Sequence, residues 1–240
     1  PDVGRQAETI AIVLEQLERF IENAFEEDGA CLEGIGYWNY GLLHYVTFAE
    51  MLRERTAGAI DLLAQEKLEA IAHYPLAVSL GHGKYASFSD ASENGSVKPF
   101  LAARIAERTG VEGLRGLVSD HPRSWRLGSA VRNVLWPQEA DEEPPPITNV
   151  FMPVSGIARL VDTAAGKPLA LAIKAGSNGE PHNQNDVGSF VLCIGGTVYL
   201  CDPGPGLYNK DYFGPKRYEN VFANSYGHSV PRIGGQLQLT

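Results

Sequence analysis

Asn178-Gly-Glu-Pro-His182-Asn-Gln-Asn-Asp186-Val-Gly-Ser-Phe190 runs directly into an apolar segment that ends at Ile194. Residues 178–186 hold a Glu, a His, a Gln, an Asp and three Asn. Polar groups that are buried beside a strand are costly unless each one is hydrogen-bonded. A contribution to stability alone is therefore a poor explanation for so many polar residues in this stretch. We therefore interpret the stretch as a functional site that is presented at the start of a β-strand.

The sequence after residue 150 predicts short β-strands that are punctuated by Gly and Asn. The expected strands cover 151–162, 169–174, 189–194, 197–201 and 229–233. The last residues, 234–240, look like the beginning of one more strand after a turn. This half of the chain is expected to be an antiparallel β-sandwich.

The sequence before residue 136 has apolar residues at helical spacing. The expected helices cover about 6–25, 39–55, 60–74, 97–108 and 124–135. Gly-rich connections at 33–36 and 80–85 join some of them. Helices joined in this way indicate an array of paired helices.

An acidic, proline-rich segment at 136–146 separates the two halves and has the composition of a linker. We expect a helical portion at 1–136, a linker at 137–149 and the N-terminal part of a β-domain at 150–240. Only about 90 residues follow the linker, so the sandwich is expected to be truncated. We therefore expect the chain to be an internal piece of a longer protein.

Composition narrows the classes of partner. The chain has 240 residues and a formal net charge of -9, which argues against nucleic acid as a partner. No apolar run approaches the roughly 18 residues of a membrane span. No signal peptide is visible in the sequence. The chain starts at Pro1 without Met, so the presence of a targeting segment before Pro1 remains an open question.

The three cysteines are expected to be free thiols. Cys193 and Cys201 flank Gly195-Gly196, a two-residue hairpin turn that would pair Ile194 with Thr197. In that register the two sulfur atoms do not face each other, so no disulfide is expected between them.

His182 is the one group in the polar stretch that titrates near neutrality. Two structural alternatives remain open, namely turn-closing Asn and Asp side chains and a hydrogen-bonded core histidine. Asp202 and His228 each end a predicted β-run and could join His182 as zinc ligands. Their spacing matches no compact metal motif, and Asp202 could equally start the turn at Pro203-Gly204.

Two further segments carry side chains suited to sugar chemistry. In Glu33-Gly-Ile-Gly-Tyr37-Trp38-Asn39-Tyr40 the aromatic residues could stack on sugar rings, or they could cap a helix end in the core. In the segment 82–90, Tyr85 lies near a Lys and a His, which can turn a phenol into an acid or base. The alternative is an ordinary loop tyrosine.

Taken together, these segments resemble the heparinase II/III-like family of polysaccharide lyases. The resemblance is carried by Glu33-Gly-x-Gly-Tyr-Trp38, Phe88-Ser-Asp90, the block 175–190, Asp202-Pro-Gly204, Arg217-Tyr-Glu219 and Asn224-Ser-x-Gly-His-Ser-Val-Pro231. It implies an α+β multidomain fold, in which an incomplete (α/α) toroid of helical hairpins precedes an antiparallel β-sandwich. It also implies that a uronic-acid-containing polysaccharide or oligosaccharide is cleaved by β-elimination.

The resemblance also implies roles for individual residues. Tyr85 would be the acid or base, His182 would face the same cleft, and Glu33 and Tyr218 would line it. Further substrate-binding candidates are Trp38, Asn39, His82 and Asn185. The family pattern commonly has a His or Asn just before Glu33-Gly34, whereas this chain has Ala30 and Cys31, so Asn39 or His82 would have to substitute.

A structural zinc ion is implied at positions matching Gln184, Asp202 and His228. Family members with zinc have a His at the first of these positions, and Gln is a poor zinc ligand. Gln184 could instead hydrogen-bond Asp202 or His228 and hold the sheet without an ion, so both a zinc site and an ion-free site stay open.

The leading hypothesis is that the protein is a carbon–oxygen lyase of bacterial type. We expect it to be periplasmic or secreted. A cytoplasmic location and oligomerisation remain possible alternatives. A non-catalytic carbohydrate-binding relative is one alternative. The other is a glycoside hydrolase, for which Glu33 and Asp90 are the candidate carboxylates.

Overall fold

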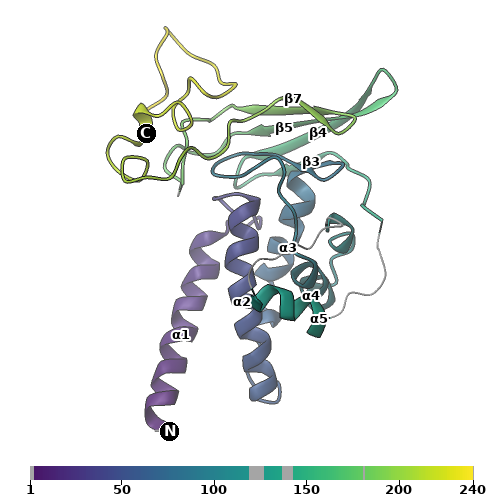
Figure 1. The fold of residues 1–240 in the computed structure, drawn as a ribbon, viewed down its shortest axis with the longest axis vertical. Helices are drawn as coiled ribbons and strands as arrows, with labels where there is room; N and C mark the ends of the chain where they lie inside the picture. Colours follow the sequence, from purple (N-terminus) through teal and green to yellow (C-terminus); the bar gives the residue numbers. More distant parts are fainter. Residues whose placement is uncertain (1–2, 119–126, 137–142, 181, 240) are drawn as a thin grey trace.

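The computed structural model describes residues 3–118, 127–136, 143–180 and 182–239. A group of helices lies against one face of an antiparallel sheet, and long loops after the sheet extend beyond its edge (Figure 1). The helices are α1 (Val3–Ala24), α2 (Ile35–Arg55), α3 (Lys67–Val78), α4 (Pro99–Thr109) and α5 (Leu127–Leu135). The short 3-10 turns are η1 (Leu62–Ala64), η2 (Arg115–Leu117) and η3 (Arg217–Glu219).

The central helix α2 packs on several sides, with Trp38, Leu42 and Val46 fully buried. It starts after Gly34, whose φ of 89° lies in the left-handed region. A Cβ atom there would meet the Ala91 Cβ at 2.7 Å, so glycine permits this close approach. The helix therefore begins at Ile35, four residues before the predicted start.

The helix predicted at 60–74 is a 3-10 turn followed by α3. The Asp61 side chain accepts the Leu63 backbone N–H and closes the short turn η1. Pro75 lies inside α3, which nevertheless continues to Val78. The helix predicted at 97–108 is α4, with Pro99 in its first turn and Gly110 in the left-handed conformation at its end. The predicted start of the last helix, near residue 124, lies outside the described residues.

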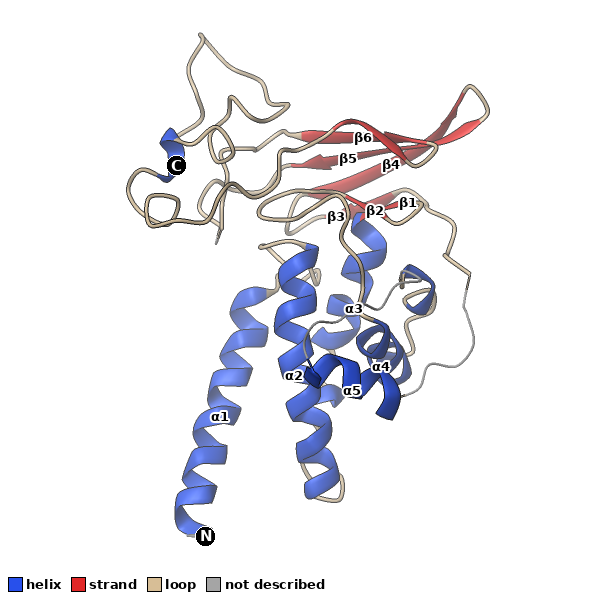
Figure 2. Ribbon diagram, viewed as in Figure 1, coloured by secondary structure: helices blue, strands red, loops and turns tan. Residues whose placement is uncertain are grey.

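Five strands form one antiparallel sheet in chain order, β3-β4-β5-β6-β7. They are β3 (Val150–Met152), β4 (Ile157–Ala164), β5 (Lys167–Lys174), β6 (Phe190–Ile194) and β7 (Thr197–Leu200). Figure 2 shows the helices on one side of this sheet. Ala170, Ala172, Val191 and Cys193 are buried members of the common core, as alternation along a half-covered strand requires.

The predicted strand at 151–162 is in fact the β3–β4 hairpin, because a turn that includes Gly156 interrupts it. The β6–β7 hairpin pairs Ile194 with Thr197 as predicted, but a bulge then shifts the register and pairs Leu192 with Leu200. Cys31, Cys193 and Cys201 are all free.

The strands predicted at 229–233 and 234–239 are wrong, because both segments are loops. Their backbone is fixed by side chains, for example by Gln238, whose Nε2 donates to the Val187 carbonyl at 2.7 Å. Among the described residues the main sheet therefore has five strands, and a separate two-stranded sheet of β1 (Ser79–Gly81) and β2 (Lys84–Tyr85) lies beside it, with β1 in contact with β5.

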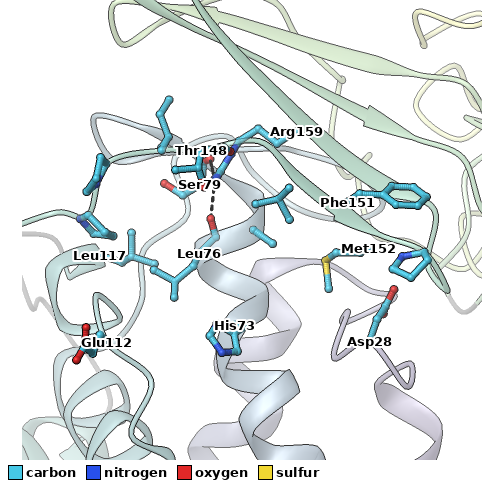
Figure 3. Close-up of a pocket in the computed structure, with 16 residues that line it drawn as sticks. Asp28, His73, Leu76, Ser79, Glu112, Leu117, Thr148, Phe151, Met152 and Arg159 are labelled. Carbon is cyan, nitrogen blue, oxygen red and sulfur yellow. Dashed lines mark hydrogen bonds between the residues drawn. The ribbon is translucent and has the colours of Figure 1, made fainter.

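Two polar contacts join the helices to the sheet. Arg159 of β4 is buried, and its Nη1 donates to the carbonyls of Leu76 and Ser79 at 2.6 Å each, at the C-terminal end of α3 (Figure 3). Asp28 accepts the backbone N–H groups of Val154 and Ser155 at 2.9 Å each. A cavity of about 450 Å³ lies between these two contacts (Figure 3).

Within the described part of the chain, none of the helices combines the length and apolar character that crossing a bilayer requires.

Candidate functional site

The polar stretch forms a loop between β5 and β6 that is held from outside. His182 has a φ of 52°, in the left-handed region, so its conformation requires support. Arg217 provides it, because its guanidinium donates to the carbonyl of His182 at 2.9 Å and to that of Asn183 at 2.8 Å. The same guanidinium stacks 4.4 Å above the ring of Tyr212. The His182 backbone is thus fixed in a shape that its own sequence does not favour.

Asp90 is the centre of the site, and its side chain is completely buried. Its Oδ2 accepts from His182 Nδ1 and from the Tyr208 hydroxyl, each at 2.7 Å. Its Oδ1 accepts from the Tyr212 hydroxyl at 2.9 Å and from Gln184 Nε2 at 3.0 Å. Burial alone would raise the pKa of Asp90, but these hydrogen bonds and the nearby Arg217 charge lower it below its ordinary value. Asp90 therefore stays ionised.

His182 lies between Asp90 and a second carboxylate. Its Nε2 is 3.6 Å from Glu33 Oε2, and its side chain is 23% exposed. The hydrogen bond to Asp90 raises the pKa of His182, with a contribution from Glu33 and against the opposing effect of partial burial. An ionised Asp90 also keeps a proton on Nδ1, so the neutral ring presents its lone pair at Nε2. The ring can therefore accept a proton from, or donate one to, a group bound beside Glu33.

Aromatic rings surround the imidazole. Tyr37, in the first turn of α2, lies with its ring centroid 4.7 Å from that of His182, and Phe213 lies at 5.8 Å. The hydroxyls of Tyr37 and Tyr208 are 3.3 Å apart. Burial and the Asp90 carboxylate raise the pKa of Tyr208 far above its ordinary value, so this phenol stays protonated. Tyr37 is thus a phenol beside His182 whose hydroxyl is linked to Asp90 through the Tyr208 hydroxyl.

The structure places Glu33 beside His182, and it places Tyr218 next to the loop that holds His182. The Tyr218 hydroxyl accepts from Asn183 Nδ2 at 3.4 Å. Tyr85 lies elsewhere, since it is 1% exposed and its hydroxyl donates to the Leu117 carbonyl at 3.2 Å. Burial raises the pKa of Tyr85 well above its ordinary value. Tyr85 thus lies in the core and away from His182, and its predicted role as acid or base stays a prediction.

The four residues expected to bind substrate also lie away from the Asp90–His182 pair or are buried by other contacts. Trp38 is fully buried and donates to the Ile71 carbonyl at 2.8 Å. Asn39 is buried and bonds the backbone of Ser96 and Lys98, which fixes the approach to α4. Asn185 is buried and donates to the Gln238 carbonyl at 3.0 Å. His82 is exposed and packs at the turn of the β6–β7 hairpin, beside Gly196.

Sequence reasoning missed the central position of Asp90 and the contribution of Tyr208, Tyr212 and Arg217. Asp90 and Arg217 lie in segments that carry the family resemblance, so the sequence did contain a signal for them. Tyr208 and Tyr212 lie in a loop rich in Gly, Pro and aromatic residues, where the spacing of residues does not indicate where each side chain points. Their hydroxyls reach Asp90 across more than 110 residues of chain.

The implied zinc site differs from expectation. Gln184 donates to Asp90 and to the Gly204 carbonyl at 3.1 Å, and not to Asp202 or His228, which was the alternative considered from the sequence. Asp186, and not Gln184, lies next to Asp202 and His228. Asp186, Asp202 and His228 are all buried and offer ligand atoms within 4.8 Å of one another.

These three residues do not fit a zinc ion, because the oxygens of Asp186 and Asp202 and the Nδ1 of His228 already have partners. Lys174 donates to both Asp186 oxygens, at 2.9 and 3.2 Å. His228 Nδ1 is 2.7 Å from Asp202 Oδ2, and the Gly204 N–H donates to Asp202 Oδ1 at 3.0 Å. Burial alone would lower the pKa of His228, but Asp202 raises it and favours the protonated ring. The second ring nitrogen of His228, Nε2, is buried and has no well-formed hydrogen bond.

Comparison with known proteins identifies the family of the C-terminal part. Residues 144–239 match the family model described as Heparinase II/III-like, C-terminal. No curated protein matches the chain. The helices and the sheet together match solved structures over about nine-tenths of this chain.

A crystal structure of heparinase III has a TM-score of 0.63 and 15% identity, and the match covers 92% of this chain and 34% of that one. Heparan sulfate lyase HepC from Pedobacter heparinus has a TM-score of 0.58 and 16% identity, with coverage of 89% and 31%. The heparinase III product of the gene BT4657 has a TM-score of 0.58 and 17% identity, with the same coverage.

At these identities the likeness shows a shared fold, and the chain spans about a third of the length of these structures. Residues 144–239 match the heparinase II/III-like C-terminal family model, and the resemblance to the heparinase II/III-like family that the sequence motifs predicted is confirmed for this part of the chain.

Proposed function

We propose that the complete protein containing this chain is a polysaccharide lyase that cleaves a uronate-bearing chain by β-elimination. The observation that carries the proposal is the pairing of His182 with buried Asp90, at a point where the ring also meets Glu33 and Tyr37. A histidine with a fixed tautomer, a phenol and flanking aromatic rings form a set suited to proton transfer on a bound sugar.

In this proposal His182 removes the proton at C5 of the uronate through Nε2. Tyr37 protonates the oxygen that leaves C4, so that a double bond forms between C4 and C5 and no water is consumed. Asp90 holds the ring and stabilises the imidazolium that results, as an ionised orienting carboxylate does in other acid–base sites. Phe213 and Tyr208 supply apolar faces beside the sugar ring.

The site argues against the hydrolase alternative. A hydrolase acting through two carboxylates needs one of them to be a protonated acid with a raised pKa. Asp90 has a lowered pKa, and four donors occupy its two oxygen atoms. It therefore has no proton to give and no free oxygen that could reach a sugar.

The same comparisons support a proposal for the architecture of the complete protein. The helices of 1–136 would form part of an incomplete (α/α) toroid, and the sheet that starts near residue 150 would be the first part of a β-sandwich. The residues between them, 137–149, would be the linker. A periplasmic or secreted location follows from the proposed substrate, because a long polysaccharide does not cross a membrane unaided.

The test uses the complete protein and a panel of uronate polymers, including heparan sulfate because HepC is named for it. A lyase gives a rise in ultraviolet absorbance from the unsaturated uronyl end. His182→Gln and Tyr37→Phe should each lower kcat by about 10²–10⁴-fold. Tyr40→Phe, on the exposed face of the same helix, is the matched control and should retain activity.

Tyr85→Phe separates the two phenols. We expect it to change stability slightly and kcat little, since it removes one hydrogen bond in the core. Binding of a polymer without any absorbance change, by folded protein, would favour the non-catalytic carbohydrate-binding relative. No binding and no cleavage of any uronate polymer would refute the proposal.

A further inference from the structure

The buried charges next to the site form a closed cluster around Lys174. This lysine lies at the end of β5, and its side chain is only 3% exposed. Its ammonium group lies 2.9 and 3.2 Å from the two oxygens of Asp186. It also lies 3.4 Å from Glu180 Oε2 and 3.4 Å from Ser89 Oγ. A single cation is thus surrounded by oxygen atoms from two separate segments of the chain, the one that holds Ser89 and the β5–β6 loop.

Those segments are the ones that carry the Asp90–His182 pair. Ser89 directly precedes Asp90, and its φ of 57° shows a backbone held in the left-handed region. Asp186 belongs to the loop that begins at His182, and its backbone N–H donates to the Gln184 carbonyl at 2.8 Å. Lys174 therefore joins the backbone on the Asp90 side to the backbone on the His182 side.

A divalent ion could bind here only by displacing the lysine. Asp186, Asp202 and His228 are the three potential metal ligands. Both oxygens of Asp186 already accept hydrogen bonds from the Lys174 ammonium group. Two cations at adjoining positions repel strongly where little water screens them. The lysine side chain is enclosed by protein, so it has no open path to solvent that would free Asp186.

We propose that Lys174 is a built-in cation that replaces a bound metal ion in joining the Ser89–Asp90 segment to the His182–Asp186 loop, so that this domain is metal-independent and excludes zinc. The inference concerns ion binding and stability, and it stands whether or not the protein is a lyase.

The experiment measures zinc content by mass spectrometry and thermal melting with chelator or with added zinc. The wild-type protein should carry no stoichiometric zinc after dialysis, and neither chelator nor zinc should move its melting temperature. Lys174→Met should melt at a lower temperature and recover stability when zinc is added, because the carboxylates of Asp186 and Glu180 are left without their cation. Lys167→Met removes an exposed lysine from the same strand and is the matched control, with no response to zinc.

A second variant keeps the proposal testable if Lys174→Met fails to fold. Gln184→His restores the histidine of the family pattern while Lys174 remains, and it should still bind no zinc. Stoichiometric zinc in the wild-type protein or in Gln184→His would overturn the proposal. A fall in the wild-type melting temperature with chelator would overturn it as well.

Discussion

Replacement of Asp90 by Asn should switch the tautomer of His182 while leaving the shape of the site almost unchanged. An ionised Asp90 can only accept, so His182 must carry its proton on Nδ1. The amide that replaces the carboxylate can instead donate from the same position to Nδ1, which moves the ring proton to Nε2. The nitrogen that faces Glu33 then has no lone pair, so it cannot act as a base.

The structure also gives the size of the accompanying loss of stability. Asp90 accepts four hydrogen bonds, from His182, Tyr208, Tyr212 and Gln184. A hydrogen bond to a charged acceptor exceeds one to a neutral acceptor by about 1 kcal/mol, so Asp90→Asn should lower the free energy of unfolding by about 4 kcal/mol. Asp211→Asn, at an exposed carboxylate in the loop between Tyr208 and Tyr212, should change it by less than about 0.5 kcal/mol.

Nitrogen NMR of the imidazole rings checks the tautomer, with His182→Gln used to assign the signal. Urea unfolding checks the stability, and kcat on a cleaved polymer should fall by about 10²–10⁴-fold. The reasoning is refuted if folded Asp90→Asn protein keeps the Nδ1–H tautomer, or if its kcat stays close to that of Asp211→Asn.

Three further predictions concern the support of the site. Arg217→Met removes both bonds to the carbonyls of the His182 loop, and a small displacement of the ring should lower kcat by about 10²-fold with little change in KM, whereas an unchanged kcat would contradict the positioning role. Arg159→Met leaves buried carbonyls at the end of α3 without donors and should lower the free energy of unfolding by about 2–4 kcal/mol in urea titrations; a loss below about 0.5 kcal/mol would show that the contact is dispensable. The raised pKa of His182 makes its bond to Asp90 stabilising below the unfolded value of about 6.5, and this stabilisation disappears as the pH rises through the folded value. His182→Gln should therefore cost more stability at about pH 6 than at about pH 9, and equal costs at both would contradict the assigned shift.

Local patterns predicted much of the fold because they depend on neighbouring residues. Pro99 and Gly110 indicate the ends of α4, and Gly195-Gly196 indicates the β6–β7 turn, from the conformations that these residues adopt readily. The segment 229–233 has the composition of a strand but finds no partner strand among the described residues. Strand pairing is a long-range property, so composition alone gave the wrong result there.

The candidate site was predicted in part for the same reason. The motifs around Glu33 and His182 indicated two side chains that the structure places 3.6 Å apart. Tyr85 has polar neighbours in sequence, yet its direction is set by packing and by the distant Leu117 carbonyl. The network around Asp90 is assembled from residues about 90 to 120 positions away, and no local pattern specifies such contacts.

The central claim is that a uronate polymer is cleaved by elimination at the site of His182 and Tyr37. The most direct measurement runs the reaction of the complete protein in heavy-oxygen water and weighs the products by mass spectrometry. Elimination adds no water, so the account predicts unsaturated products that carry no heavy oxygen when they are weighed before their reducing ends exchange oxygen with the solvent, and none of these products with His182→Gln. Saturated products that carry heavy oxygen at the new end would show hydrolysis and would contradict the account.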